Sequence, residues 1–250
     1  VVAAMQALQE AARRLGIPVA SSSAAVVGAG GAIGRATALL LAPHVQSLWL
    51  VGNPASGRRA LERLEQVAHE IRHSVAPAPQ LAITTDAPAA LQRSQLVVVA
   101  TNSADAFIEP AMLAFGAVVC DMSRPPNTSR RVQSERPDVL VIDGGVIEVP
   151  GRPDFGWNFG YERGLAYACM AETMMLALEH HYQHTSLGLD LPLETVRWMD
   201  ELLLPRGFTR QVCLAMSLAG EAPARPVPRG VDLILADPDD DRLVRAIAYC

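Results

Sequence analysis

The sequence predicts an α/β protein whose core is a doubly wound, mostly parallel, six-stranded sheet with added C-terminal helices. Three observations favour this fold class. Six short apolar runs alternate with helical or loop segments up to residue 143. The first of these runs leads through a glycine-rich turn into a helix. The run at residues 96–101 is continuously apolar, as in a parallel strand buried on both faces, so the sheet is expected to be Rossmann-like.

The composition is that of a folded protein, because half of the 250 residues are hydrophobic and only 19% are charged. The net charge of −5 argues against a nucleic-acid partner. No apolar run is long enough for an integral membrane segment, and Glu10, Arg13 and Arg14 interrupt the region where a signal peptide would be apolar. We therefore expect a cytoplasmic protein. All 21 basic residues are arginine, which excludes a mechanism that needs a lysine of this chain.

The elements follow one another in the expected order. Residues 1–15 have the apolar spacing of a helix that Gly16-Ile17-Pro18 ends, and a chain that begins within a helix is expected to be truncated at its N-terminus. A strand at 24–27 and a helix that Pro43 stops come next. A further helix is expected at about 57–72. The remaining strands are expected at residues 47–51, 81–84, 96–101, 117–121 and 139–143.

Residues 24–37 form the order strand, glycine turn and helix start, at which backbone N–H groups meet a dinucleotide phosphate. The spacing is GxxGxxG, because Ile33 stands where a GxGxxG pattern would need its last glycine. Glycines also mark ordinary turns, but the flanking strand and helix favour a cofactor site. The residues expected to surround the pyrophosphate are Gly28, Gly30, Gly31, Ala32, Ile33 and Gly34.

The end of the second strand indicates which dinucleotide is bound. In a parallel sheet this position meets the adenosine ribose, where an acid favours NAD and an arginine accepts the 2′-phosphate of NADP. Asn53 follows the strand here, and Arg58 and Arg59 begin the next helix. The pattern favours NADPH, and the alternative is a solvated pair of arginines on a helix surface.

Polar residues follow the later strands at the same edge of the sheet, where ligands bind in such folds. They lie at 101–103, 121–123 and 143–145. For Asp121 and Asp143, capping of a loop explains the residue as well as catalysis does. The residues expected to line the cofactor site at this edge are Thr101, Asn102, Gly144 and Gly145.

The C-terminal third is expected to be helical, with helices at 161–184, 192–204 and 209–218. Three prolines within residues 221–230 indicate a linker, and a short strand is expected at 231–235. The expected organisation is an NADP-binding domain over 1–160, a helical part over 161–218, and a linker with a C-terminal extension over 219–250.

Cysteines provide the candidate nucleophiles, since a thiolate attacks acyl groups readily. Cys169, on the expected helix 161–184, would share a face with Leu165, Ala166, Glu172 and Thr173. Cys120, at the end of a strand, is its rival. Spacing alone favours a packing role for either thiol. Neither the cysteines nor the histidines have the full spacing of a metal site, so no metal is expected.

Three of these segments together resemble the long-chain acyl-(acyl carrier protein) reductases of cyanobacteria, which make fatty aldehydes. They are the turn at 26–34, the Gly-Gly-Val-Ile-Glu run at 144–148 and the Ala-Cys-Met-Ala-Glu run at 168–172, in this order. The resemblance covers about residues 1–208 and lacks the family's N-terminal region. It implies that Cys169 takes the acyl group of an acyl thioester, carried by acyl carrier protein or CoA, and that NADPH reduces it to the aldehyde. Asn53 departs from the arginine that the family tends to carry there.

Two other functions stay open. Dehydrogenases of the shikimate type have a similar glycine turn, but they rely on a lysine that this chain lacks. The chain is also compatible with a non-catalytic nucleotide-binding domain of a larger protein. Further domains are expected at both termini.

Overall fold

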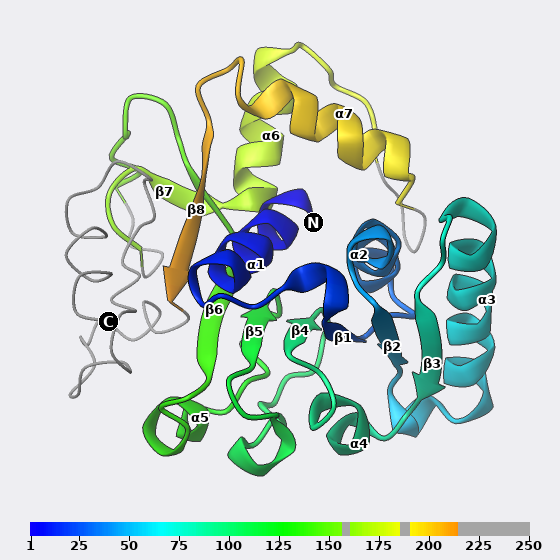
Figure 1. Cartoon of the computed structure of the whole chain (residues 1–250). Coiled ribbons are helices and arrows are strands. Elements are labelled where there is room, and N and C mark those ends of the chain that lie inside the picture. The colour runs from blue at the N-terminus through cyan, green and yellow to red at the C-terminus, as the bar shows by residue number, and fades with distance from the viewer. Residues whose placement is uncertain (157–160, 186–190, 215–250) are drawn as a thin grey trace.

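The computed structural model describes residues 1–156, 161–185 and 191–214, and its centre is one sheet with the strand order β3-β2-β1-β4-β5-β6-β7, in which β8 also pairs with β6 (Figure 1). All pairings from β3 to β6 are parallel. This order is that of a doubly wound Rossmann-type sheet, so the predicted fold class is confirmed. The parallel strands are β1 (Ser23–Val27), β2 (Ser47–Val51), β3 (Gln80–Thr84), β4 (Leu96–Val99), β5 (Val118–Asp121) and the first half of β6 (Leu140–Glu148).

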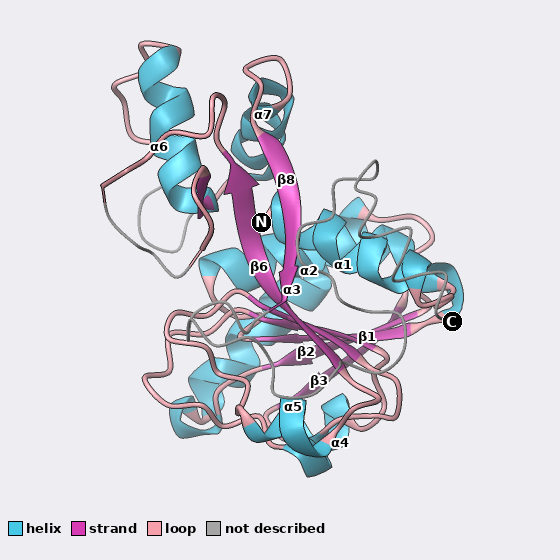
Figure 2. Cartoon of the chain, turned by 90° about the vertical axis from the view of Figure 1, so that its left-hand side faces the viewer, coloured by secondary structure: helices cyan, strands magenta, loops and turns pink. Residues whose placement is uncertain are grey.

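Helices cover both faces of the sheet (Figure 2). On one face lie α1 (Val2–Arg14), α2 (Ala32–Leu41) and α3 (Arg58–Ser74), and on the other lie the short helices α4 (Ala87–Leu91) and α5 (Arg131–Glu135). The continuously apolar β4 supplies both cores, because Leu96 and Val98 pack on the first face and Val97 and Val99 on the second. Single 3-10 turns occur at Val19–Ser21, Ala42–His44, Pro54–Ser56 and Pro110–Met112.

Strand β6 runs five residues beyond its predicted end and leaves the parallel sheet. The pairing register shifts between Asp143 and Val146, and Gly145, within this bulge, has a φ of +87°. The bend directs the second half of β6 towards a C-terminal layer, where it pairs antiparallel with β7 (Leu165–Tyr167) and β8 (Thr209–Leu214) (Figure 2).

Two predicted helices are therefore wrong in part. The helix expected at 161–184 is reduced to α6 (Ala168–Leu178), because residues 165–167 form the strand β7 on β6 and the helix ends six residues before its expected end. The helix expected at 209–218 is the strand β8 over residues 209–214. By contrast, α7 (Leu193–Leu203) confirms the helix expected at 192–204. The end of the third expected helix at 215–218, and the linker, strand and extension expected over 219–250, lie outside the described residues.

The C-terminal layer has a core of its own, in which Phe208, Met175 and Leu203 pack against Ile147 of β6 and Ala3 of α1. Because this core includes Ile147 and Ala3, strand β6 and helix α1 join the C-terminal layer to the rest of the molecule. Among the described residues, no helix has the length and apolar character to cross a membrane.

Candidate functional site

Three backbone segments approach one another closely at the glycine turn between β1 and α2. Gly28 has a φ of +86°, and its N–H donates a hydrogen bond of 2.8 Å to the carbonyl oxygen of Val51. A Cβ atom on Gly28 would lie 2.2 Å from the carbonyl oxygen of Ala100, and one on Gly34 would lie 2.1 Å from that of Gly28. Neither position accepts a side chain without a backbone shift, which explains the first and last glycines of the GxxGxxG pattern.

Helix α2 begins at this turn with free backbone donors. Gly31 is its N-cap, its N–H donates to the carbonyl oxygen of Gly28 at 3.0 Å, and no side chain caps the helix start. The N–H groups of Ala32, Ile33 and Gly34 in the first turn therefore have no acceptor within the helix. Ile33 is 49% exposed, so this end of the helix faces solvent. Backbone donors and the helix dipole together suit a phosphate group.

Arginines of α3 lie beside the turn. Arg58 and Arg59 are exposed in the first turn of α3. Arg63 was not anticipated, but a Cβ on Gly30 would lie 3.3 Å from the Cβ of Arg63, so this side chain begins next to the glycine turn. Its spacing of four from Arg59 is the sequence signal that could have found it. None of the three arginines is held by an ion pair or a hydrogen bond among the described residues.

Asn53 has a local structural role, because its side-chain oxygen accepts a hydrogen bond of 2.9 Å from the N–H of Ala55 and caps the turn that precedes α3. Thr101 lies on the other side of Gly28, with its methyl group 3.1 Å from the position that a Cβ would take. The hydroxyl of Thr101 donates to Asn127, and its N–H donates to the hydroxyl of Ser123 at 3.2 Å. Asn102 is exposed at the same edge of the sheet.

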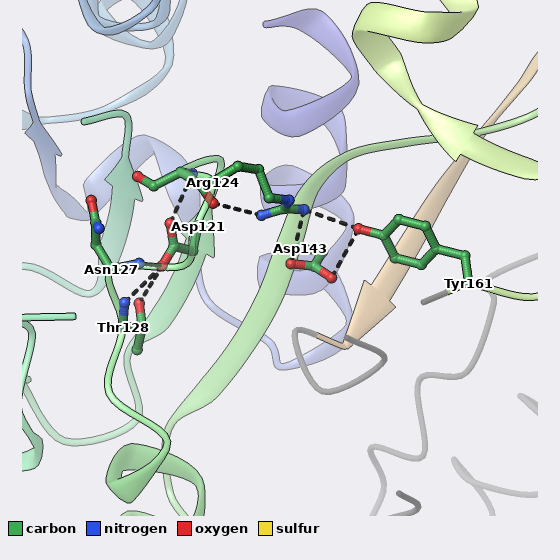
Figure 3. Close-up of polar contacts among 7 residues, drawn as sticks. Asp121, Arg124, Asn127, Thr128, Asp143 and Tyr161 are labelled. Atoms are coloured by element: carbon green, nitrogen blue, oxygen red, sulfur yellow. Dashed lines mark hydrogen bonds and ion pairs between the residues drawn. The ribbon is translucent and has the colours of Figure 1, made fainter. Parts of the chain in front are cut away.

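Asp121 orders the loop after β5 (Figure 3). The carboxylate is fully buried and accepts hydrogen bonds from the N–H groups of Ser123, Asn127 and Thr128 at 2.8–2.9 Å. The Thr128 hydroxyl adds a fourth bond of 2.9 Å. All four partners are donors, so the loop-capping explanation of this acid is confirmed.

Asp143 belongs to a polar cluster with Arg124 and Tyr161, two residues that the sequence analysis missed (Figure 3). Arg124 Nη2 lies 3.2 Å from Asp143 Oδ1, and the Tyr161 hydroxyl donates to Asp143 Oδ2 at 3.2 Å. Burial lowers the pKa of Arg124, but the charge of Asp143 and the contact with Tyr161 raise it, and the net shift is upward. Burial and the charge of Asp143 raise the pKa of the Tyr161 hydroxyl. The cluster thus holds a protonated arginine and a protonated tyrosine around one carboxylate.

The glycine pair directly follows Asp143, at which the parallel pairing of β6 with β5 ends, and it lies within the continuing strand and not in a loop. A Cβ on Gly144 would lie 2.4 Å from Met122 Cγ and 3.0 Å from Cys120 Sγ. A Cβ on Gly145 would lie 3.3 Å from that of Ala168, at the start of α6. The pair therefore allows β6 to pass close to its neighbours before it bends towards α6.

The two candidate thiols lie in opposite environments. Cys169 is exposed and is the second residue of α6, where the positive end of the helix dipole favours an anion. Leu165 and Ala166 do not share its helix face as expected, because both lie in β7. Cys120 is fully buried, and burial together with the charges of Asp121 and Asp143 raises the pKa of its thiol. Only Cys169 of these two has the exposure that a nucleophile needs.

A pocket of about 100 Å³ lies between α1, β6, α6 and α7. Ala168, the residue before Cys169, is part of its wall. Its apolar walls include Ile147, Ala168, Met175, Leu191 and Leu203. Glu172 and Asp200 also line it. Arg35 of α2 pairs with Glu70 of α3 and donates to the carbonyl oxygen of Leu191 at 3.4 Å, which links the helix of the glycine turn to the pocket wall. Within the described ranges no cluster of three or more His, Cys, Asp or Glu side chains could hold a metal ion.

Two curated proteins are similar to most of this chain. Aminotransferase PigE from Serratia sp. is 32% identical over 209 residues, which are 82% of this chain and 23% of PigE. Long-chain acyl-[acyl-carrier-protein] reductase from Synechococcus elongatus is 30% identical over 210 residues, which are 80% of this chain and 57% of the reductase. The chain therefore spans less than two thirds of either relative. The resemblance to the acyl-(acyl carrier protein) reductases is confirmed as partial homology. No model of a known protein family matches the chain.

Solved structures share parts of the fold. Shikimate 5-dehydrogenase from Listeria monocytogenes aligns with a TM-score of 0.42 and 18% identity, covering 57% of this chain and 51% of that chain. The nucleotide-binding domain of glutamyl-tRNA reductase from Thermoplasma volcanium aligns with a TM-score of 0.38 and 17% identity, covering 54% and 83%. Both TM-scores lie below 0.5, so neither likeness carries an argument about function.

Proposed function

We propose that this chain is an NADPH-dependent oxidoreductase that reduces an acyl thioester to an aldehyde through a thioester on Cys169. The observation that carries the proposal is the exposed thiol at the N-terminus of α6, one residue after Ala168 in the wall of a largely apolar pocket, on the same chain as a dinucleotide-type glycine turn. The partial homology to a long-chain acyl-[acyl-carrier-protein] reductase supports it. The division into a domain over 1–160 and a part over 161–218 is proposed with it.

The residues around the glycine turn fit a dinucleotide. The space that a Cβ on Gly28 or Gly34 would fill is taken by backbone, so the chain can present the uncapped N–H groups of α2 to a pyrophosphate. Arg58, Arg59 and Arg63 offer to a 2′-phosphate three guanidinium groups that have no ion pair in the described part of the chain, which favours NADPH over NADH. NADPH, when bound, supplies a hydride to the substrate.

Cys169 performs the acyl transfer in this proposal. Its thiolate attacks the carbonyl carbon of the acyl thioester, the bond from that carbon to the carrier sulfur breaks, and the carrier thiolate leaves and takes up a proton. Once the enzyme thioester is reduced, the bond between Cys169 Sγ and the former carbonyl carbon breaks. The products are the free aldehyde and the regenerated thiolate.

The pocket between α6 and α7 is the proposed site of the acyl chain. Ala168, next to the nucleophile, lies in its wall, and Met175 and Met199 add flexible thioether side chains that adapt to an alkyl chain. The acyl group would enter from the exposed start of α6, with its carbonyl at Cys169. In this arrangement the first half of the chain holds the cofactor and the C-terminal layer holds the substrate.

Intact-protein mass spectrometry after incubation with palmitoyl-CoA tests the proposal. Without NADPH, we expect one palmitoyl adduct, on Cys169, that the Cys169→Ala variant does not form. Added NADPH should remove the adduct and release hexadecanal. The Cys213→Ala variant serves as the matched thiol control and should be acylated like the wild type. A chain that binds NADPH but acquires no adduct would support a nucleotide-binding module, and an adduct on Cys169→Ala would refute the assigned nucleophile.

A further inference from the structure

Arg124 lies at the point where β5, β6 and the segment before α6 meet. Its Nη2 donates to Asp143 Oδ1 at 3.2 Å and to the Tyr161 hydroxyl at 2.9 Å, and its Nη1 donates to the carbonyl oxygen of Ser123 at 2.8 Å. Figure 3 shows the guanidinium directed from the β5 loop towards Asp143 and Tyr161. Three partners from three segments fix its orientation.

This guanidinium also holds the ring of Tyr167. Its central carbon lies 5.1 Å from the centre of that ring, a cation–π geometry. The ring of Tyr161 meets Tyr167 edge to face, with ring centres 5.2 Å apart and planes at 74°. Arg124 Nε is buried without a hydrogen-bond partner in the described chain, which leaves the aromatic contact as one interaction that offsets the burial of this cation.

Tyr167 connects this cluster to Cys169. It is the last residue of β7 and the N-cap of α6, two residues before Cys169, and no side chain caps the helix start with a hydrogen bond. Its backbone pairs with Val146, three residues beyond Asp143 on β6. Strand β6 therefore holds the start of α6 twice, through the backbone ladder at Val146 and through the Asp143–Arg124–Tyr167 chain of side-chain contacts.

A contribution to stability alone does not explain why an ion pair of Asp143 and Arg124 occupies this position. Asp143 is fully buried, and a buried ion pair is often no more stabilising than apolar side chains of similar size. What such a pair adds is a defined direction, because a carboxylate and a guanidinium constrain each other more narrowly than apolar groups do. Here the pair with Asp143 orients the Arg124 guanidinium, and the guanidinium in turn orients the ring of Tyr167.

We propose that Arg124 is a positioning residue that, through Tyr167, fixes the start of α6 and thereby the attack geometry of Cys169. The inference rests on the proposed function, in which Cys169 accepts the acyl group. A nucleophile displaced by about 1 Å can lose about a hundredfold in rate. Arg124 forms no bond to substrate in this role, and the acyl-transfer step is the one given above.

A double-mutant cycle in the full chain tests the link. The variants are Arg124→Gln, Tyr167→Leu and the two combined, and the readout is the rate of palmitoyl-CoA adduct formation at Cys169. We expect each single variant to lower the rate at saturating thioester by roughly tenfold, with an unchanged half-saturating concentration. The combined variant should lose no more than either single variant, because both break the same chain of contacts. Arg124→Lys, which keeps the cation but loses the fork, should restore part of the rate.

Arg131→Gln is the matched control, since Arg131 is exposed and pairs only with Glu109 and Glu135 among the described residues. It should acylate at the wild-type rate. A folded Arg124→Gln chain with wild-type acylation would overturn the proposal, as would independent effects of Arg124→Gln and Tyr167→Leu that multiply.

Hydrogen exchange at the amides of residues 171–175, whose N–H groups bond to carbonyl oxygens within the first turns of α6, measures the same cycle without a substrate. Loss of the anchor should accelerate exchange there by roughly tenfold in each variant and no further in the combined one. This separates two failures. A wild-type chain that is never acylated refutes the proposed function, whereas unchanged exchange in Arg124→Gln refutes the anchor whatever the chemistry.

Discussion

A Cβ atom on Gly34 would lie 2.1 Å from the carbonyl oxygen of Gly28, so the first turn of α2 rests directly on the backbone of the glycine turn. We expect Gly34→Ala to separate the two segments, to lower the free energy of unfolding by about 1–3 kcal/mol and to abolish NADPH binding. Urea denaturation and fluorescence titration with NADPH measure the two effects. For stability, Gly31→Ala is the matched control, because its Cβ would have an ordinary contact of 3.4 Å with Gly28. Equal stabilities of the two variants would contradict the assigned contact.

Arg58, Arg59 and Arg63 of α3, which have no ion-pair partner among the described residues, should determine the preference between NADPH and NADH. Charge-assisted hydrogen bonds to a phosphate contribute about 1.5–3 kcal/mol, so the combined change of Arg58 and Arg59 to Gln should weaken NADPH binding by roughly tenfold or more. NADH binding should stay the same, since NADH lacks the 2′-phosphate. Isothermal titration with both cofactors provides the measurement, first for this pair and then for Arg63→Gln. Exposed Arg72, in the last turn of the same helix, is the control for a change in net charge.

The loop after β5 should depend on the charge of Asp121. In Asp121→Asn an NH₂ group would face N–H and hydroxyl donors, because all four hydrogen bonds to this carboxylate come from donors. We expect the free energy of unfolding to fall by about 1–3 kcal/mol. Denaturant unfolding beside the exposed control Asp105→Asn measures the loss. A variant as stable as the control would show that the loop has another source of order.

The contact between Arg136 and Asp138 should make stability depend on pH in acid. The hydrogen bond from Arg136 lowers the pKa of Asp138 to about 2 against the opposing effect of burial. A carboxyl group with a lowered folded-state pKa stabilises the fold above its unfolded pKa, near 4, and loses this contribution as the pH falls towards 2. The wild type should therefore exceed Asp138→Asn in stability by about 2 kcal/mol at pH 6, and the difference should shrink between pH 4 and pH 2. Urea denaturation at several pH values tests this, and a difference that is constant down to pH 2 would exclude the ion pair as its source.

Local patterns in the sequence were enough to predict the parallel strands of the sheet. All six predicted parallel strands form, because each apolar run is short, is separated from the next by a helix or loop, and can be buried only in a sheet covered on both faces. The helix α3 was predictable from its buried face at Ala60, Leu64, Val67, Ala68 and Ile71, which follows the helical period. The glycine turn was predictable for the same reason, since strand, turn and helix are contiguous.

The C-terminal layer was not predictable in this way. The apolar run around Ala168 continues across a strand and a helix, so its hydrophobicity has no period that separates β7 from α6. What separates them is the bend of β6 at Gly145, beyond which the edge of β6 that had paired with β5 is free to pair with residues 165–167. A pairing partner so distant in the chain leaves no trace in local periodicity.

The sequence by itself determined the doubly wound sheet and the glycine turn, because both depend on contiguous residues and on the burial of apolar runs. It also supplied Cys169 as a candidate nucleophile. Only the tertiary structure decided which thiol is accessible, since burial of Cys120 and exposure of Cys169 arise from packing between distant segments. It also brought together Arg124, Asp143 and Tyr161, which are 18 to 37 residues apart in pairs. Side chains that far apart meet only when the sheet places the ends of β5 and β6 next to each other and the bend of β6 returns the chain to them.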